Sequence, residues 1–102
     1  MSLKLALKIH DSDNVATIFA NDIKSGMQVE VRDKKGNAEI ITVADDIPYG
    51  HKVAIADIGI NEQIIKYGEE IGVATKEIKK GHHVHVHNLD SMRGRGDLKG
   101  GV

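Results

Sequence analysis

Four copies of one short pattern constrain the fold more than any other feature of the sequence. Each copy has an acidic residue, Ile, two variable residues, Gly or Asn, two more variable residues and then Val or Ile. The Ile suits a buried position at the start of a tight turn, and Gly or Asn tolerates the left-handed conformation that closes it. The pattern therefore predicts four similar corners, each followed by a strand that enters the core. The copies span residues 22–29, 46–53, 57–64 and 77–84.

The segments around these corners have the patterns of strands. The odd-numbered residues from Leu3 to Ile9 are all Leu or Ile, so we expect them to face the core, with His10 on the polar face. Segments 28–32 and 38–43 flank a loop that contains Gly and Asn, which is typical of a β-hairpin. β-Branched residues predict further strands at 52–56, 63–67 and 82–88. The predicted fold class is all-β, a small compact single domain with short helical turns.

The length of the chain limits it to one small domain. It has 102 residues, 40% hydrophobic but only 3% aromatic, so the core must be built from Ile, Val, Leu and Ala. Such a core is thin, and a partner is expected to complete part of the apolar surface; the alternative is a modestly stable monomer. We expect the domain to span 1–90 and a flexible Gly/Arg-rich tail to span 91–102.

Charge and cysteine content exclude several classes of function. The formal net charge is −1, which gives no overall electrostatic attraction to nucleic acid or to an anionic membrane surface. The absence of cysteine excludes disulfides, thiolate metal sites and cysteine nucleophiles. No apolar run approaches the length of a membrane span, and the N-terminus lacks the pattern of a signal peptide. A cytoplasmic location is expected.

Four of the six histidines lie within 82–87. On a strand, His83, His85 and His87 share one face, while the two valines between them point into the core. Imidazoles two residues apart on an extended segment can approach one divalent ion, and neutral imidazole suits iron or zinc. The alternative is that these histidines are half-exposed strand residues or hydrogen-bond partners of Asn88, since no adjacent carboxylate completes a ligand set.

Two further segments combine proton-transfer groups with a glycine that permits close approach. His51 and Lys52 follow one glycine, and Lys66 and Tyr67 precede another. Lysine suits a carboxylate, and histidine or tyrosine suits proton transfer. The alternative is that the lysines are solvated strand residues and that His51 is a corner residue. Two pairs of adjacent acids are interpreted as solvated, at 45–46 and 69–70.

Four short motifs occur in an order and spacing that resemble the N-terminal SAF domain of the altronate dehydratase and galactarate dehydratase family. The resemblance extends from about Leu3 to Leu98 and implies a SAF-type β-clip, a small folded-over β structure. The combination is far more specific than any single motif. The motifs are Asp-Asn-Val-Ala at 13–16, Ile-Pro-Tyr-Gly-His-Lys at 47–52, Lys-Tyr-Gly at 66–68 and His-Val-His-Asn at 85–88.

The resemblance also implies an activity and a partner. In this family the domain is fused ahead of a large catalytic region or is a separate small subunit, and this chain is expected to be the separate subunit. The implied activity is a hydro-lyase reaction on a sugar acid, with a large catalytic subunit and a divalent metal such as iron(II). The small subunit of a sulfolactate sulfo-lyase shares the domain and is the alternative.

These implications give each candidate residue a hypothetical role. His85 and His87 are expected to line a metal or substrate site, and Lys52 or Lys66 to pair with the substrate carboxylate. His51 or Tyr67 is expected to assist proton transfer where the large subunit meets the domain. The isolated chain is then expected to be inactive. A non-catalytic docking module is the alternative from another class, and a homo-oligomer remains open.

Overall fold

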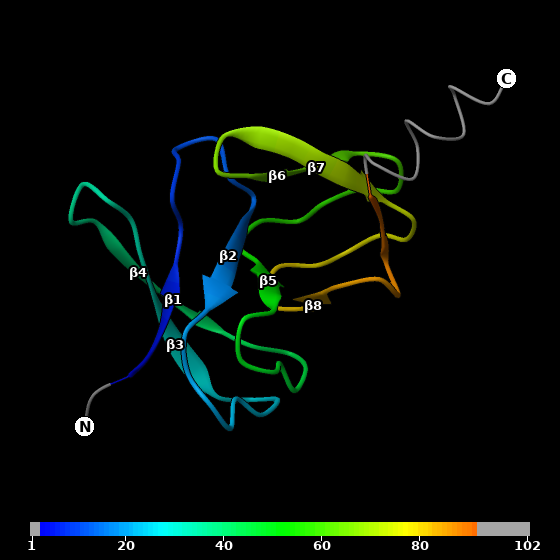
Figure 1. The fold of residues 1–102 in the computed structure, drawn as a ribbon. Helices are drawn as coiled ribbons and strands as arrows, with labels where there is room; N and C mark the ends of the chain where they lie inside the picture. Colours follow the sequence, from blue (N-terminus) through cyan, green and yellow to red (C-terminus); the bar gives the residue numbers. More distant parts are fainter. Residues whose placement is uncertain (1–2, 92–102) are drawn as a thin grey trace, which may run out of the picture.

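A computed structural model describes residues 3–91 as an all-β fold of nine strands (Figure 1). The fold class predicted from the sequence is thus confirmed, although no helix of any kind occurs between residues 3 and 91 in place of the expected short helical turns. The strands are β1 (Lys4–Leu7), β2 (Val15–Ile18), β3 (Gln28–Arg32), β4 (Ala38–Thr42), β5 (Lys52–Ala54), β6 (Gln63–Lys66), β7 (Glu69–Ala74), β8 (His83–Val84) and β9 (Leu89–Ser91).

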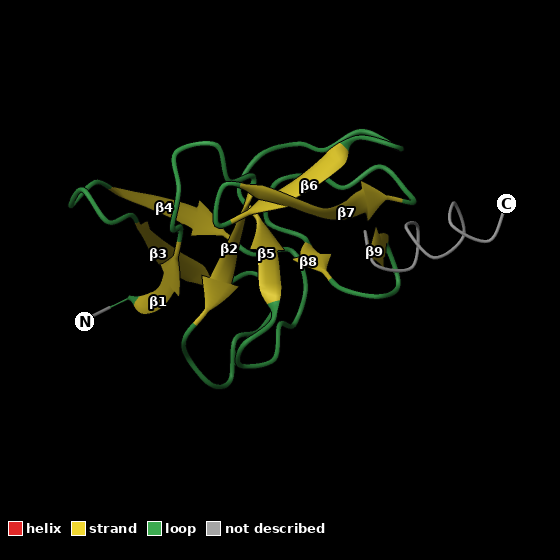
Figure 2. Ribbon diagram, turned by 45° about the horizontal axis from the view of Figure 1, so that its top comes forward, coloured by secondary structure: helices red, strands yellow, loops and turns green. Residues whose placement is uncertain are grey.

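The strands form two sheets. A six-stranded sheet has the order β4-β3-β1-β2-β5-β8, in which only β1 and β3 run parallel, and a three-stranded sheet has the order β6-β7-β9. Figure 2 shows the β6–β7 hairpin next to the β2 and β5 part of the larger sheet. One apolar cluster fills the β1–β4 part of the fold, and a second joins β5 and β8 to the smaller sheet.

All four corners predicted from the sequence are present. Their isoleucines, Ile23, Ile47, Ile58 and Ile78, are at most 2% exposed. They form two isolated antiparallel bridges, Ile23 with Ile47 and Ile58 with Ile78, so the corners pair two by two. One pair lies in each apolar cluster. The residues that close the corners have positive φ, at Gly26 (+92°), Gly50 (+82°), Asn61 (+68°) and Gly81 (+95°).

Two of these corners place the starts of β5 and β8 side by side. The Gly50 amide donates to Ile18 on β2, and the Gly81 amide donates to Ala54 on β5. Each bond joins the glycine that closes a corner to a neighbouring strand of the six-stranded sheet. The residues that follow the glycine therefore begin to pair with that strand at once. Since histidines follow both glycines, the corners bring His51 and residues 82–83 to the same sheet edge.

Asp13 and Asn14 join the two sheets. The Asp13 carboxylate is buried and accepts hydrogen bonds from the amides of Ile9, His10 and Gly68. Asn14 accepts a bond from the Ile65 amide on β6. Gly68 closes the turn of the β6–β7 hairpin, so these two side chains attach that hairpin to the β1–β2 connection. This explains what the Asp-Asn-Val-Ala motif contributes to the fold.

The sequence pattern of the first strand gave the wrong buried face. Ala6 is fully buried, whereas Leu5 and Leu7 are only half-buried. Ala6 lies opposite Ile18 on β2 and Val31 on β3, and these larger side chains fill the interior on that face. Only the small side chain is therefore fully enclosed. His10 is exposed, as expected.

The strand predicted over 82–88 is correct only at β8. Residues 85–88 form a turn, and the valine expected in the core, Val86, is 79% exposed. The Asn88 side chain accepts a bond from the His85 amide, and the Asn88 amide donates to the His85 carbonyl, which draws the backbone out of the extended form. The other valine expected in the core, Val84 on β8, is buried as predicted.

The other strand predictions agree with the structure in part. The β3–β4 hairpin forms around the predicted loop, and the predicted strands at 52–56 and 63–67 contain β5 and β6. The sequence patterns missed β2, β7 and β9. Since β9 ends at Ser91, the fold reaches the first residue of the expected tail, and residues 92–102 lie outside the described residues. No helix able to span a membrane occurs in the described part of the chain.

Replacing Gly81 with Ala is expected to destabilise the fold more than Gly26→Ala. Both glycines have a similar positive φ, so both substitutions strain the backbone by roughly 1–2 kcal/mol. A Cβ at Gly81 would overlap the Thr42 carbonyl oxygen, whereas nothing lies within 4 Å at Gly26. Urea unfolding should show a clearly larger loss of unfolding free energy for Gly81→Ala. Equal losses would mean that the sheet adjusts to the extra methyl group.

Candidate functional site

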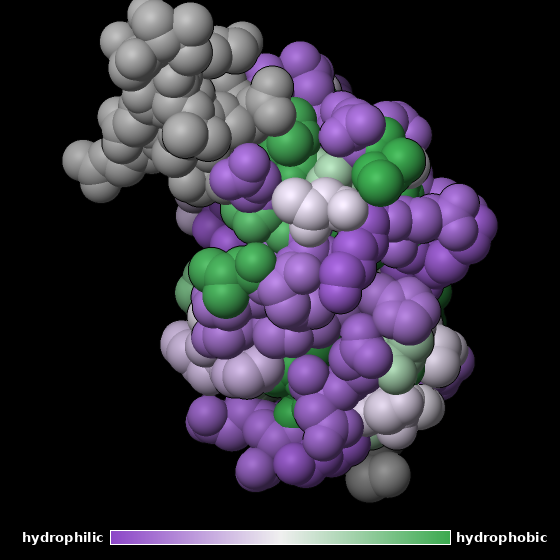
Figure 3. Space-filling view, turned by 90° about the vertical axis from the view of Figure 1, so that its right-hand side faces the viewer, coloured by the Kyte–Doolittle hydropathy of each residue, from purple (hydrophilic) through white to green (hydrophobic). Residues whose placement is uncertain are grey.

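Pairing of β5 with β8 gathers histidines that are far apart in the sequence. Lys52 pairs with Val84 and Val53 pairs with His83, so the same register places His51 across from His85. β8 is the last strand of the six-stranded sheet, which leaves these side chains at an edge. Figure 3 views the molecule from the side of β8 and shows a surface covered mostly by hydrophilic side chains.

Three rings form what we call the imidazole cluster: His51, His83 and His85. His51 Nδ1 lies 2.8 Å from His83 Nε2, and the rings of His51 and His85 stack with centroids 4.0 Å apart. One nitrogen from each ring lies within 4.8 Å of the other two. Three converging nitrogens are the donor set that borderline divalent metals accept, so the cluster fits such an ion.

Lowered pKa values make two of these rings, His83 and His85, suited to ligation. Burial lowers the pKa of His83 to about 4, helped by positive charge on the neighbouring His87, His51 and His85. Burial also lowers the pKa of His85, together with His51, Lys52 and His87. His83 is therefore neutral at pH 7 and keeps a lone pair, and neutral imidazole is the form that binds metals.

The two histidines predicted as metal ligands have different surroundings. His85 is half-buried within the imidazole cluster. His87 is exposed on the turn, with its ring centroid 5.1 Å from that of His83, and it lines a hollow of about 280 Å³ beside Asp45 and His82. His87 is not among the three rings whose nitrogens converge. The cluster instead includes His51, which the sequence pointed to as a proton-transfer residue, and His83.

Lys66 and Tyr67 belong to the β6–β7 hairpin of the smaller sheet, and Lys52 to β5 of the larger one. Lys52 is half-buried on β5, and burial together with the nearby Lys66 ammonium lowers its pKa. Lys66 Nζ lies 4.9 Å from the centre of the Tyr67 ring. Tyr67 has a φ of +58° in the turn between β6 and β7 and is 54% exposed. The Lys52 charge reaches His85, which connects these residues electrostatically to the imidazole cluster.

The sequence missed one contact that supports the cluster. Asp45, interpreted as solvated, is half-buried, and its Oδ2 accepts the His83 amide and lies 3.0 Å from His82 Nδ1. Burial raises the pKa of Asp45, but these bonds outweigh it and hold the pKa below its usual value. An acid just before a corner motif was the available signal. The Asp45–His82 contact spans 37 positions, so no local pattern predicts it.

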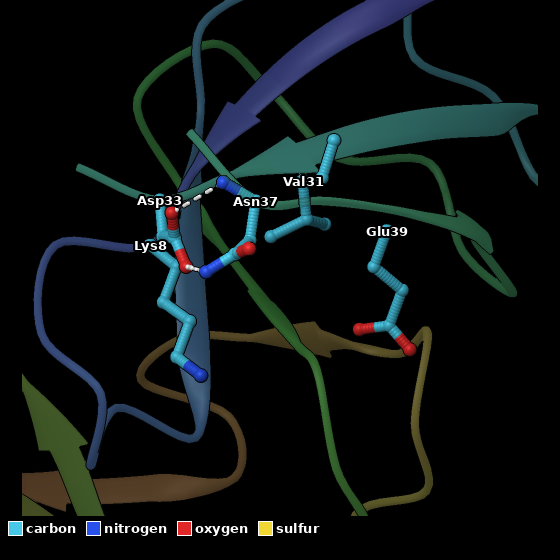
Figure 4. Close-up of a pocket in the computed structure, with 6 residues that line it drawn as sticks. Lys8, Val31, Asp33, Asn37 and Glu39 are labelled. Atoms are coloured by element: carbon cyan, nitrogen blue, oxygen red, sulfur yellow. Dashed lines mark hydrogen bonds between the residues drawn. The ribbon is translucent and has the colours of Figure 1, made fainter. Parts of the chain in front are cut away.

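A second hollow lies away from the histidines. It has a volume of about 140 Å³ and opens at the β3–β4 hairpin (Figure 4). Asn37 donates from its backbone and side-chain nitrogens to Asp33, which closes the hairpin loop. The lining contains none of the predicted site residues: Lys8, Val31, Asp33, Asn37, Ala38 and Glu39.

Comparison with known proteins identifies the family. The profile of the altronate/galactarate dehydratase SAF domain matches residues 4–92. The chain belongs to this family. It is similar to altronate dehydratase of Bacillus subtilis (strain 168), with 41% identity over 86 residues, or 84% of this chain and 16% of that protein. Galactarate dehydratase (L-threo-forming) of Escherichia coli (strain K12) is 44% identical over 75 residues, which are 74% of this chain and 13% of the relative.

A third relative differs in size. The (2R)-sulfolactate sulfo-lyase subunit alpha of Chromohalobacter salexigens is 36% identical over 88 residues, which cover 83% of this chain and 93% of the relative. The SAF-domain chain thus spans about a sixth or less of the two dehydratases but nearly all of a separate lyase subunit. The relatives place the chain in a lyase family.

Protonation of the half-buried His83 should make stability depend on pH. The unfolded chain binds a proton at His83 near pH 6.5, but the folded chain only near pH 4. Between these values the unfolded state holds more protons, so the unfolding free energy should fall as the pH drops from 6.5 to 4 and then level off. Thermal melts of His83→Asn should show a weaker dependence in this window, with exposed His10→Asn as the control. An unchanged slope in His83→Asn would contradict the assignment.

Proposed function

We propose that the chain is the small subunit of a sugar-acid hydro-lyase of the altronate or galactarate dehydratase type, acting with a larger catalytic chain. The family match and the near-complete coverage of a separate lyase subunit support this format. The observation that carries the proposal is the imidazole cluster, in which three ring nitrogens converge at an open sheet edge. The isolated chain then has no activity of its own.

The imidazole cluster is proposed to hold a divalent metal, with iron(II) as the expected ion. When bound, the metal supplies positive charge where negative charge develops on the substrate. His51, His83 and His85 would be the protein ligands, and His87 lies at the rim of this site, where it contacts the substrate or the partner chain. His85 thereby keeps its predicted role as a ligand. The predicted role of His87 as a ligand is tested below by mutation.

The neighbouring polar residues suit the remaining steps of an elimination. Removal of the proton beside a carboxylate needs a cation for that carboxylate and groups that move protons. Lys52 and Lys66 are proposed to pair with the substrate carboxylate, since their ammonium groups are close enough for the Lys66 charge to lower the pKa of Lys52. Because His51 is occupied within the imidazole cluster, Tyr67, with its exposed ring, is the preferred proton-transfer residue of the predicted pair.

The distribution of aromatic side chains supports a partner. The chain has one Phe and two Tyr, and all three are exposed: Phe19 (42%), Tyr49 (57%) and Tyr67 (54%). The rings of Phe19 and Tyr49 meet edge to face, with their centroids 6.0 Å apart. Tyr49 is two residues before His51 in the sequence. Aromatic residues are enriched in protein interfaces, so these exposed rings are proposed to meet the larger chain. A larger chain that covers them would also close the site.

A sulfolactate sulfo-lyase small subunit is the second candidate. It is favoured by the 93% coverage of the Chromohalobacter salexigens subunit alpha. Both reactions begin with the same need for a base and a stabilised carboxylate, so the imidazole cluster suits either. The larger chain is expected to determine whether water or sulfite leaves.

Activity should be lost when the imidazole cluster is broken. The complex with the larger chain is assayed for keto-acid formation from altronate and galactarate, and for sulfite release from sulfolactate. His51→Ala, His83→Ala and His85→Ala should each lower kcat/KM by about 100-fold or more, since each removes a proposed ligand. Lys34→Ala, an exposed change in the β3–β4 loop, is the control. Full activity in the three histidine variants would refute the catalytic proposal, and His87→Ala shows whether the rim histidine contributes.

The aromatic pair should matter for assembly rather than for folding. Tyr49→Ala is expected to weaken binding to the larger chain by about 2 kcal/mol if the residue is an interface hot spot. Ile40→Ala, which removes an equally exposed side chain from the distant edge strand β4, is the matched control. Isothermal titration of the two chains measures the effect. Equal affinities for the two variants would place the interface elsewhere.

A further inference from the structure

The strand that carries His83, β8, is too short to be held in place by its backbone hydrogen bonds to β5 alone. β8 has two residues, and no described strand pairs with its outer side. His83 lies opposite Val53, yet its own backbone groups bond to side chains. Its amide donates to Asp45 Oδ2 at 2.9 Å, and its carbonyl accepts from Asn88 Nδ2 at 2.8 Å. The backbone N–H and C=O of His83, which face away from β5, are thus both hydrogen-bonded to side chains.

Asp45 binds this edge through a charged oxygen. The oxygen that accepts the His83 amide also lies 3.0 Å from His82 Nδ1. Hydrogen bonds to an ionised carboxylate are about twice as strong as those between neutral groups. Asp45 comes from the loop before the second corner, 38 positions earlier than His83. It therefore fixes the start of β8 to a distant part of the fold.

Asn88 binds two members of the imidazole cluster at once. Its side chain donates to the His83 carbonyl and accepts the His85 amide at 3.0 Å, and its own amide donates to the His85 carbonyl. Asn88 is only 7% exposed, so these bonds face little competition from water. The position of the His85 ring relative to His83 therefore depends on one buried amide side chain.

We propose that Asp45 and Asn88 are positioning residues that pre-organise the imidazole cluster for a divalent metal. The inference rests on the proposed metal-binding function and adds the two residues that hold its ligands. An edge strand of two residues frays easily, whereas metal ligands must be placed within about 0.5 Å. The side-chain bonds to His83 and His85 supply that precision. They also block the edge from pairing with a strand of another molecule.

The first test measures metal affinity in the isolated chain. Co²⁺ is titrated while its visible absorption is followed. Asp45→Ala and Asn88→Ala should weaken binding by about 10- to 100-fold, the usual effect of removing an outer-shell partner. Asp45→Asn keeps an oxygen for the His83 amide and should recover part of the affinity. Asp46→Ala is the matched control, because Asp46 also accepts a backbone amide, that of Ser25 at 2.9 Å, but at a different corner.

The second test needs no metal. Imidazole ¹⁵N spectra report the hydrogen bond between His51 and His83, which should give one fixed tautomer in the wild type and averaged signals in Asp45→Ala and Asn88→Ala. Amide spectra and melting temperatures identify any variant that has unfolded. If Asp45→Ala has unfolded, the affinity and imidazole spectra of Asp45→Asn are used in its place. Wild-type affinity and unchanged imidazole signals in both alanine variants would overturn the inference. If the wild type binds no Co²⁺, the metal function fails, while the imidazole spectra still decide whether these residues position the rings.

Discussion

The left-handed residue that closes each corner is the constraint on which the rest of the structure depends. It lets the chain reverse direction within a few residues, so an isoleucine can be buried and a new strand can begin at once. The corner isoleucines pair two by two, and each apolar cluster contains one of these pairs. Because Gly50 and Gly81 directly precede histidines, the same device that builds the core also builds the site.

The site combines groups that would repel one another if they were all charged. Burial and repulsion from the neighbouring histidines keep His83 neutral, so this ring offers a lone pair near neutral pH. The rings of the imidazole cluster sit at an edge of the six-stranded sheet rather than in an enclosed cavity. This arrangement suits a domain that contributes part of a catalytic centre and relies on a larger chain to enclose it.

Local patterns predicted the parts of the fold that local chemistry determines. The four corners and the β3–β4 hairpin depend on residues that are neighbours in sequence, and both were predicted from the sequence. The buried face of β1 was not, because it depends on the partners Ile18 and Val31 across the sheet. The end of β8 was misplaced because a side-chain hydrogen bond from Asn88 overrides the strand preference of the valines.

The candidate site shows the same division. The sequence indicated that residues 82–87 carry the chemistry, and it identified His51 as a candidate. It did not join them, since His51 and His83 are 32 positions apart and meet only through strand pairing. Asp45 was missed for the same reason. A site assembled from three separate segments is visible only once the sheet order is known.

Crystals of the chain grown with Co²⁺ and measured at the cobalt absorption edge test the central claim most directly. The account predicts one strong anomalous peak within bonding distance of His51, His83 and His85. A peak confined to the His82 and His87 side of β8, or no ordered ion at the sheet edge, would contradict it.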